Sequence, residues 1–528
     1  MSRSMNRSAG AMSLAITLSR LAGLVREQVI AGCFAPGATD AFWAAFRIPN
    51  MLRELLAEGS LNAAFVPVYT EVREQQGKAA AFRLANCVLS VLMVVTGLFG
   101  LSIVLFSKAY VLSISSGFDP NKIDAAATVA QFLSPFLFFL SIGAVLMGMA
   151  NVRGEYFIPS VASAGFNLAM VFSAVLLTPV CEHAGLPGVT SLAIGSVLGG
   201  ALQLAIQLPA TWRDGFRFRV LFDAVGGASR KILMRMGPAV VGVAGTFINT
   251  LVDSQVASHY GDGPMSYLVY AFRIWLLPVG LFGVAISTVN LTHVSRDRAR
   301  GDMSGFRTTL GSSLRMTLVL TIPAAVGLML LAQPIVRVLY QHGKFGPEAT
   351  QATALLLSLY AIGLPAYALI KLYVPTLYTL GRSWVPVSVS LAMIGAKVVI
   401  NVMIWRAGWS YAWLALTTGL AACANATITS LLLRREVGSL AKEHVMSTAF
   451  KALLASGAMA GTCWLTGWGL LSVLPGDALV PSIVRLTLQI VAGLLVLFPV
   501  MAQLGVSEAQ QLLGIGARLL RRLSGGSR

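Results

Sequence analysis

The residues most able to act on a ligand are basic side chains that interrupt long apolar stretches of the sequence. They are Arg20, Arg26, Arg47, Arg53, Arg273, Lys371 and Lys397. A charged side chain at the centre of a lipid-facing helix costs about 2.5 to 3.5 kcal/mol, so such residues usually face a protein interior or a water-filled cavity. Arginine keeps its charge and offers a planar fork that matches phosphate oxygens. The pattern therefore predicts a site that binds an anion.

Two interpretations of these cations stay open. In one, acids on the same helical face neutralise them, because Arg47 and Glu54, like Arg20 and Glu27, stand seven residues apart. In the other, which we favour, the arginines line a hydrated cavity and bind an anionic ligand. Four of the seven cations lie in the first two apolar segments, so we expect the site to involve those segments.

The sequence carries no pattern for covalent catalysis or metal binding. It has no CxxC, HExxH, GxSxG or Walker motif, and no aspartate pair that would hold Mg²⁺ against a diphosphate. The five cysteines and five histidines are scattered, which favours packing and loop positions for them. We therefore predict a protein that is not an enzyme, with no catalytic residues, no metal and no cofactor.

Asp253 is an acid within a predicted helix, near Asn249 and Thr250. Two readings of it are equally favoured: a ligand for a coupling ion, or a residue near a helix end.

Composition predicts the elements that must position these residues. Only 11% of the 528 residues are charged, against about 25% in soluble domains, and 56% are hydrophobic. The charges fall in clusters between long uncharged stretches, so we predict an all-α, polytopic membrane protein. The fourteen predicted transmembrane helices lie near 10–31, 40–70, 84–107, 129–150, 159–178, 188–209, 237–258, 265–291, 312–332, 351–372, 384–405, 411–433, 448–474 and 486–505.

Loop charges predict the orientation of this bundle. With the N-terminus inside, most of the 39 Lys and Arg fall in cytoplasmic segments, including the clusters at 213–219, 296–300 and 518–522. The few basic residues on the opposite side are Lys108, Lys122, Arg337, Lys344, Arg406 and Arg485. Both termini should be cytoplasmic, and residues 1–31 should be a retained span rather than a signal peptide. The net charge of +18 then reflects topology and contact with anionic lipid, and no nucleic-acid partner is expected.

An internal repeat organises the predicted helices. Ala-Phe-Arg-Ile occurs at 45–48 and 271–274, and a Gly-x4-Phe-Arg pattern follows at 77–83 and 301–307. Both copies start from the same side of the membrane, so we predict a parallel pseudo-two-fold repeat of six helices each. The expected domains are an N-lobe at 1–210, a C-lobe at 211–435, and helices 13 and 14 with a basic tail at 436–528. Composition leaves it open whether helices 13 and 14 simply pack toward lipid or form a groove for a long lipid tail.

Several segments resemble a known family. Residues 19–27, 38–42, 46–53, 57–59 and 64–67 read SRLAGLVRE, ATDAF, FRIPNMLR, AEG and AFVP, and QLAIQLP, MGPA, QHGKF and GLAACANA follow at 203–209, 236–239, 341–345 and 419–426. Over its first twelve helices the chain resembles the MurJ (MviN) family of bacterial lipid II flippases, in the multidrug/oligosaccharidyl-lipid/polysaccharide exporter superfamily. The sequence departs from the family pattern at Glu27, and at 290–295 (NLTHVS), where the family usually has a proline-containing stretch and where the shape of the gate is therefore in doubt.

The resemblance implies a V-shaped bundle of two six-helix lobes, with two further helices forming a tail groove. The resemblance implies that Arg20, Arg26, Arg53 and Arg273 line the cavity together with the acids Asp40 and Glu58. The pattern of basic residues in apolar segments adds Arg47 to these arginines. Some members resemble sodium-coupled transporters, and Asp253 and Asn401 match that site only loosely.

The expected function follows from the resemblance. The chain would move lipid II from the cytoplasmic to the outer leaflet of the bacterial inner membrane by alternating access, with the diphosphate headgroup in a cationic central cavity. The membrane potential would drive it, with Na⁺ or H⁺ as candidate coupling ions, and its partners would be lipid II, membrane lipids and the cell-wall synthesis machinery.

Three alternatives fit the residues less well. An exporter of another polyprenyl-linked glycan or of a drug shares the fold, but a drug exporter should prefer acids in its cavity. A polyprenyl-diphosphate transferase would need an acidic metal-binding cluster, and a membrane scaffold would not need to retain seven buried cations.

Overall fold

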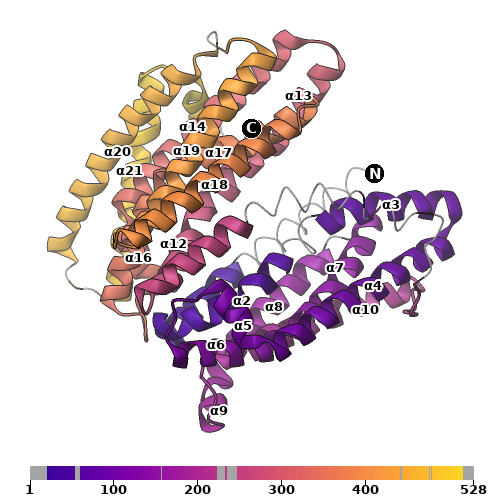
Figure 1. The fold of residues 1–528 in the computed structure, drawn as a ribbon. Helices are drawn as coiled ribbons and strands as arrows, with labels where there is room; N and C mark the ends of the chain where they lie inside the picture. The colour runs from indigo at the N-terminus through magenta and orange to yellow at the C-terminus, as the bar shows by residue number, and fades with distance from the viewer. Residues whose placement is uncertain are drawn as a thin grey trace, which may run out of the picture. The chain divides into compact units, whose positions relative to one another are not determined.

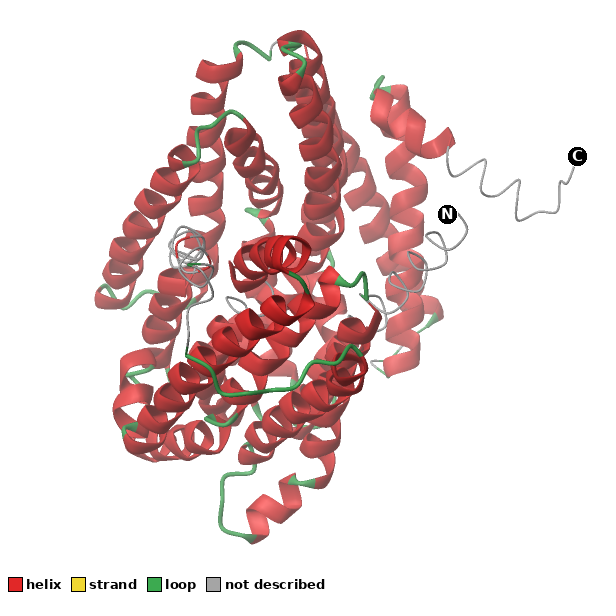
Figure 2. Cartoon of the chain, turned by 90° about the vertical axis from the view of Figure 1, so that its right-hand side faces the viewer, coloured by secondary structure: helices red, strands yellow, loops and turns green. Residues whose placement is uncertain are grey.

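The computed structural model describes residues 21–53, 60–155, 157–222, 247–440, 443–474 and 478–514, and the single residues 227, 232, 234 and 476. Within these ranges the regular secondary structure is entirely helical (Figure 2), which confirms the predicted all-α class. Two compact units divide the chain (Figure 1). Unit 1 comprises Met1–Ser266 with His342–Phe345, and unit 2 comprises Tyr267–Gln341 with Gly346–Arg528.

The described part of unit 1 starts with helical residues 21–33, and the unit contains the described helices up to residue 260. They are α2 (Pro36–Arg53), α3 (Ser60–Gln76), α4 (Lys78–Leu105), α5 (Ser107–Ile114), α6 (Pro120–Leu133), α7 (Phe136–Val152), α8 (Phe157–Leu176), α9 (Thr178–His183), α10 (Thr190–Arg213), helical residues 247–257 and the short η2 (Ser258–Tyr260).

Unit 2 contains the remaining described helices, although the first turn of α12 still belongs to unit 1. They are α12 (Pro264–Pro278), the π-helical η3 (Val279–Val284), α13 (Ala285–Ala299), α14 (Met303–Leu330), α15 (Ala332–Tyr340), α16 (Pro347–Ala361), α17 (Leu364–Thr379), α18 (Trp384–Arg406), α19 (Ala412–Val437), α20 (Val445–Val473), α21 (Leu479–Gln503) and helical residues 507–514.

Ten of the fourteen predicted spans match described helices that are long and apolar enough to cross a membrane. Eight are single: α4, α8, α10, the continuous helix 264–299, α14, α18, α19 and α21. Two are bent pairs, α6–α7 with a bend of 41° and α16–α17 with a bend of 48°. Another predicted span, 448–474, corresponds to α20, a helix of 29 residues. The segments near 10–31, 40–70 and 237–258 include residues outside the described ranges, so the exact count of fourteen stays a prediction.

An aromatic stack forms part of the core of unit 1. Phe42 and Phe46 of α2 stack with ring centroids 5.2 Å apart, and Phe46 continues to Phe136 of α7 at 5.8 Å. Phe136 in turn meets Phe166 of α8 at 5.7 Å. Such ring pairs add about 0.5 to 1.5 kcal/mol each beyond the burial of their area. The stack therefore holds α2, the helix that carries Arg47 and Arg53, against α7, and holds α7 against α8.

The family-like QHGKF segment returns to unit 1 from a distance in the sequence. Lys344 donates its backbone N–H to the Gly32 carbonyl at 2.9 Å, and the His342 ring lies 2.8 Å from the Gln28 carbonyl. Gly343 has a φ of 57°, and a Cβ there would collide with the Gly32 backbone. Only glycine suits this position, because it tolerates the left-handed conformation and leaves room for the approach.

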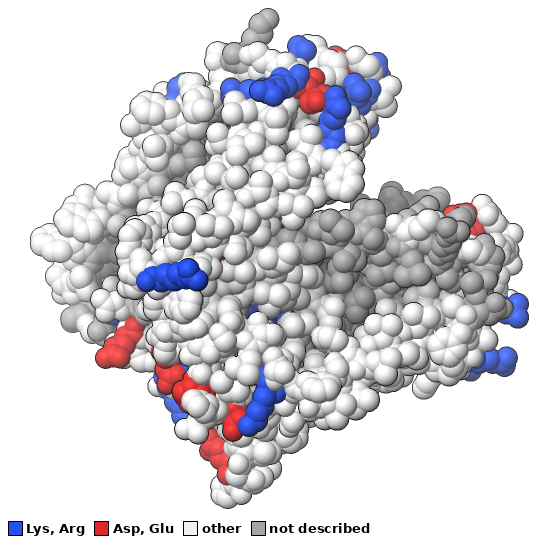
Figure 3. All heavy atoms as spheres, in the orientation of Figure 1, with Lys and Arg blue, Asp and Glu red and all other residues white. Residues whose placement is uncertain are grey.

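Unit 2 packs around α14. One buried cluster joins α14 to α13, α17 and α19 through Phe306, Leu310, Leu314, Leu372 and Leu433. A second cluster joins α14 to α20 and α21. Figure 3 shows charged side chains gathered at one end of this unit, beyond a broad uncharged surface. This separation is what an apolar membrane interior imposes on surface charge.

The repeat inferred from the sequence has matching structure in the two units. Gly77 and Gly301 both have a positive φ, 86° and 71°, and both stand just before a helix of 28 residues, α4 and α14. The two Ala-Phe-Arg-Ile copies lie on α2 in unit 1 and α12 in unit 2, and each of these helices contains a proline. The four-letter identity therefore lies on a helix in each copy, and the six-helix repeat stays a prediction.

Candidate functional site

Arg26 is the best-defined cation of the predicted site. It lies on helical residues 21–33 of unit 1, with its side chain 12% exposed. Its Nη1 donates to Asn167 Oδ1 of α8 at 2.8 Å, and its Nη2 pairs with Glu27, a residue only 2% exposed. An amide and a carboxylate thus fix the direction of the guanidinium group. Glu27 pairs here with its neighbour, whereas the Arg20 that shares its helical face lies outside the described residues.

Asn167 is a functional candidate that the sequence analysis missed. It is buried in α8, whose surroundings in the sequence are otherwise apolar. A lone amide within a predicted span was the available signal, since polar groups inside a membrane bundle are usually hydrogen-bonded.

Arg47 and Arg53 both project from α2 in unit 1 and are both half-buried. Arg53 Nε donates to Asn50 Oδ1, one turn earlier, at 3.2 Å. The acids Glu54 and Glu58 lie outside the described residues, so the pairing of Arg47 with Glu54 and the cavity role of Glu58 stay predictions.

Arg273 lies on α12 in unit 2, half-buried, next to an aromatic cluster. Phe272 and Trp275 lie 5.1 Å apart, and Trp275 meets Tyr367 of α17 at 4.9 Å. The exposed Lys371 places its ammonium 5.1 Å from the centre of the Tyr367 ring. Two of the predicted intramembrane cations therefore lie on α12 and α17 of unit 2, and the Tyr367 ring stabilises the positive charge of Lys371.

A second polar interior lies between α18 and α19 of unit 2. Lys397 is 3% exposed and Asn401, one turn later on α18, is fully buried. Asn401 Oδ1 accepts from Thr417 Oγ1 of α19 at 2.8 Å. Asp253, the other candidate ligand for a coupling ion, is half-buried in helical residues 247–257 of unit 1.

Asp40 is a heavily hydrogen-bonded acid of unit 1. Its side chain is fully buried and accepts four hydrogen bonds: from Lys122 Nζ at 2.9 Å, Gly263 N at 2.7 Å, Ser266 N at 2.7 Å and Ser266 Oγ at 2.6 Å. Asp40 therefore caps the first turn of α12 with its carboxylate, at the end where the helix dipole favours negative charge.

Lys122 extends this cluster toward solvent. Its ammonium also pairs with Asp262 at 2.7 Å, and that carboxylate is 75% exposed. Gly261 and Gly263 flank Asp262 with positive φ values of 84° and 107°, which lets the chain turn tightly before α12. The Gly-Asp-Gly-Pro string at 261–264 suits this helix start, because proline is favoured in the first turn of a helix. Nothing local indicated Lys122 or Asp40 as its partners.

The predicted site residues are thus distributed over both units. Arg26, Asp40, Arg47, Arg53 and Asp253 lie in unit 1, Arg273 and Asn401 lie in unit 2, and Arg20 and Glu58 lie outside the described residues. Among the described residues, no three His, Cys, Asp or Glu come together as metal ligands.

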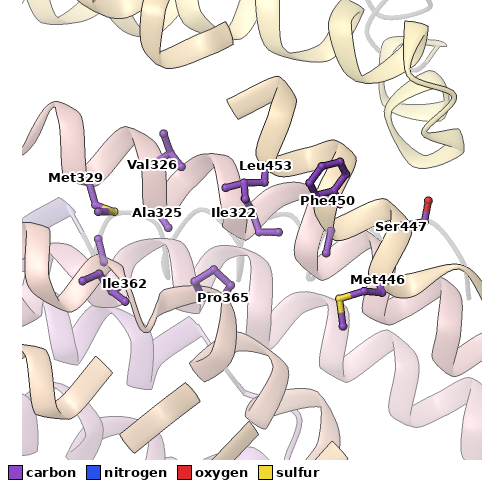
Figure 4. A pocket seen from close by; sticks show the side chains of 12 residues that line it. Ile322, Ala325, Val326, Met329, Ile362, Pro365, Met446, Ser447, Phe450 and Leu453 are labelled. Carbon is purple, nitrogen blue, oxygen red and sulfur yellow. The ribbon is translucent and has the colours of Figure 1, made fainter. Parts of the chain in front are cut away.

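An apolar cavity of about 700 Å³ lies within unit 2 (Figure 4). Ile322, Val326 and Met329 of α14 form one wall, and Phe450 and Leu453 of α20 form another. Residues at the α16–α17 bend, among them Ile362 and Pro365, complete it. Phe450 is 62% exposed, so the α20 side of the groove is open. The lining thus includes α20, the predicted helix 13, with α14 and the bend, and none of the lining residues comes from α21. A groove for a lipid tail on helices 13 and 14 stays a prediction.

Comparison with known proteins identifies relatives over most of the chain. The family model described as "Lipid II flippase MurJ" matches residues 31–478. A probable lipid II flippase MurJ of Rhizobium meliloti is 34% identical over 395 residues, covering 73% of this chain and 71% of that protein. The lipid II flippase MurJ of Burkholderia cenocepacia is 32% identical over 430 residues, covering 79% and 81%.

Solved structures show the same fold. A lipid II flippase MurJ in an inward closed conformation matches with a TM-score of 0.78 and 23% identity, covering 95% of this chain and 99% of that one. An inward-facing multidrug resistance transporter of the MATE family, in the MOP superfamily, matches with a TM-score of 0.63 and 14% identity, covering 80% and 96%.

The contacts of Asp40 predict that Asp40→Ala lowers the stability of the protein much more than Asp262→Ala does. Asp40→Ala would leave the buried ammonium of Lys122 and the first turn of α12 without their main acceptor. Breaking a buried pair by removing one partner costs about 3 to 5 kcal/mol. We expect a clear fall in the midpoint of thermal unfolding of the detergent-solubilised protein, measured by intrinsic fluorescence. Asp262→Ala is the matched control, because an exposed pair contributes about 1 kcal/mol or less. Equal midpoints for the two variants would contradict this account.

Proposed function

Because the chain belongs to the MurJ family, we propose that it is a lipid II flippase that transfers lipid II from the cytoplasmic to the outer leaflet of a bacterial membrane. The observation that carries this proposal is that the chain has both half-buried arginines and an open apolar groove. Fixed and half-buried arginines suit an anionic diphosphate, and an open apolar groove suits a long polyprenyl tail. The names of the relatives describe transport rather than catalysis.

The headgroup would be bound by arginines of the predicted site. Arg26 has its guanidinium direction set by Asn167 and Glu27, so little side-chain freedom is lost when an anion binds. Arg47 and Arg53 on α2, and Arg273 on α12, add positive charge on helices that are equivalent in the repeat. Arg20 and Glu58 belong to the same proposed site by resemblance.

The tail would stay in apolar surroundings throughout. Each methylene moved from water into hydrocarbon gains about 0.8 kcal/mol, so a long tail cannot accompany the headgroup through a hydrated cavity. The groove formed by α14, α20 and the α16–α17 bend offers such surroundings on unit 2. Its lining is apolar apart from Ser447.

The remaining features of the cycle belong to this proposal. Alternating access would expose a cationic central cavity to one side and then the other, in a membrane that we take to be the inner one, with both termini cytoplasmic. The expected N-lobe, C-lobe and tail-groove division at residues 210 and 435 would describe its moving parts. Asp253 and Asn401 are candidates for a coupling ion, Na⁺ or H⁺, and the cell-wall synthesis machinery is the proposed protein partner.

Arginine variants test the headgroup site. Arg26→Ala and Arg273→Ala should fail to support growth when the host's own lipid II flippase is depleted, although each protein still reaches the membrane. Loss of one charge-assisted contact of about 1.5 to 3 kcal/mol implies at least about tenfold slower transfer. Arg406→Ala, which changes an exposed arginine at the end of α18, and Cys423→Ala should grow normally. Normal growth of both cavity variants would remove the arginines from the proposed site.

Filling the groove tests the tail site. Ala449→Trp places an indole in the cavity lining on α20 and should slow the appearance of labelled lipid II at the outer leaflet at least severalfold, because the tail loses its apolar path. Ala458→Trp makes the same change on an exposed face of α20 and should leave the rate unchanged. An unaffected rate in the Ala449→Trp protein would show that the tail lies elsewhere.

The membrane potential tests the energetics. An inside-negative potential favours outward movement of an anionic headgroup by about 2.3 kcal/mol per charge per 100 mV, and it also favours the inward return of the emptied cationic site. We expect dissipation of the potential in sealed cells to slow the exposure of lipid II at the outer leaflet. Exposure at an unchanged rate, with the potential verified as collapsed by a voltage-sensitive dye, would contradict this driving force.

A further inference from the structure

A second pocket of unit 2 differs in chemistry from the apolar groove. It encloses about 330 Å³ between the α14–α15 junction, the end of α20 and the beginning of α21. Its walls combine two arginines, Arg337 and Arg485, with two tryptophans, Trp464 and Trp468. The described residues that line it include no Asp or Glu. A pocket of this composition favours a ligand that has both a negative charge and an apolar part.

Arg485 provides a fixed cationic wall. The residue is 8% exposed, and its Nη2 donates to the Gly476 carbonyl at 2.6 Å and approaches Ser482 Oγ at 3.4 Å. These contacts tie the guanidinium to the segment between α20 and α21. Arg337 adds a second guanidinium from α15 and is half-buried. Two planar forks that border one small volume match the oxygens of a phosphate group.

Two exposed tryptophans at the mouth of the pocket indicate that it lies at the edge of the apolar surface. Trp464 and Trp468 stand one turn apart on α20 and are 62% and 72% exposed. Tryptophan is enriched where hydrocarbon meets headgroups, because its ring is apolar and its N–H is polar. Leu471 on the same wall is 54% exposed, so acyl chains can lie directly beside the charged part.

A polar tie between α20 and α21 maintains the floor. Cys463 Sγ lies 3.3 Å from the Gln489 carbonyl, and Gln489 Nε2 approaches the Cys463 carbonyl at 3.4 Å. A Cβ at Gly467 would collide with the Gln489 amide, so the glycine leaves space for this side chain. The floor of the pocket is therefore built from packed and hydrogen-bonded residues, whereas Trp464, Trp468 and Leu471 form its exposed wall.

We propose that this pocket binds the phosphate of an anionic glycerophospholipid, held by Arg337 and Arg485 with its acyl chains along Trp464, Trp468 and Leu471. The pocket lies at the end of the bundle where α20 finishes and α21 starts. In the proposed topology this end is at the outer leaflet. The site is independent of lipid II transfer, since none of its residues belongs to the arginine set or to the apolar groove described above.

The experiment uses the full-length protein in vesicles that contain a photoactivatable phosphatidylglycerol with its crosslinker near the headgroup. We expect crosslinks to peptides that span residues 464–489. The double variant Arg337→Gln/Arg485→Gln should reduce them at least about tenfold, which corresponds to about 1.4 kcal/mol. Arg406→Gln, an equal change of an exposed arginine, should leave the crosslinks unchanged. Arg337→Gln alone, at a half-buried position, should give an intermediate reduction and guards against misfolding of the double variant.

Three outcomes would overturn the proposal. Equal crosslinking of wild-type and variant proteins would show that the arginines do not hold the lipid. Equal crosslinking by a matched phosphatidylcholine probe would show that net negative charge is not recognised. Displacement of the phosphatidylglycerol probe by a stoichiometric amount of farnesyl diphosphate would assign the pocket to a polyprenyl diphosphate instead. Since none of these measurements requires transfer, they can fail while the proposed flippase activity stands.

Discussion

The free-energy cost of taking a charge out of water governs where the buried ionisable residues of the described segments lie. A charge in an apolar interior is stable only when opposite charge and hydrogen-bond donors or acceptors surround it. Asp40 meets this requirement with one ammonium, two backbone N–H groups and a hydroxyl. Arg26 meets it with a carboxylate and an amide. The same constraint that makes such residues rare makes each of them well oriented, which is what a binding site needs.

The two units share sequence patterns and backbone features, but unit 2 has two further helices. A glycine in the left-handed conformation precedes a 28-residue helix in each unit, and an arginine occupies the same place in the repeated tetrapeptide on α2 and α12. Unit 2 alone then adds α20 and α21, which pack on α14 through small and apolar residues such as Ala452, Ala455 and Cys463. These added helices create surfaces of two kinds, an apolar groove beside the α16–α17 bend and a cationic pocket at the far end of α20. A lipid-handling protein needs both, because each lipid molecule joins an apolar chain to a charged group.

The sequence predicted the class of protein better than it predicted contacts. Low charge density and long apolar segments are properties of the chain itself, and ten predicted spans correspond to described helices that can cross a membrane. Loop positions were harder to interpret. Lys122 was assigned to the exterior side only as one of a few basic loop residues, yet it is 9% exposed and bridges Asp40 and Asp262. The count of like charges in a loop contains no information about which of them turns inward.

The sequence by itself determined that the chain is an apolar, all-helical protein, that short patterns recur within it and that arginines interrupt its apolar segments. These properties depend on composition and on spacings of a few residues, which are readable without a fold. Only the tertiary structure decided which charges meet. Asp40 and Lys122 are 82 residues apart, and Asp40 and Ser266 are 226 apart, so their contact depends on how α2, α6 and the first turn of α12 pack within unit 1. Similarly, Arg337 and Arg485 share a pocket because α15 and α21 lie together, and no local pattern encodes that proximity.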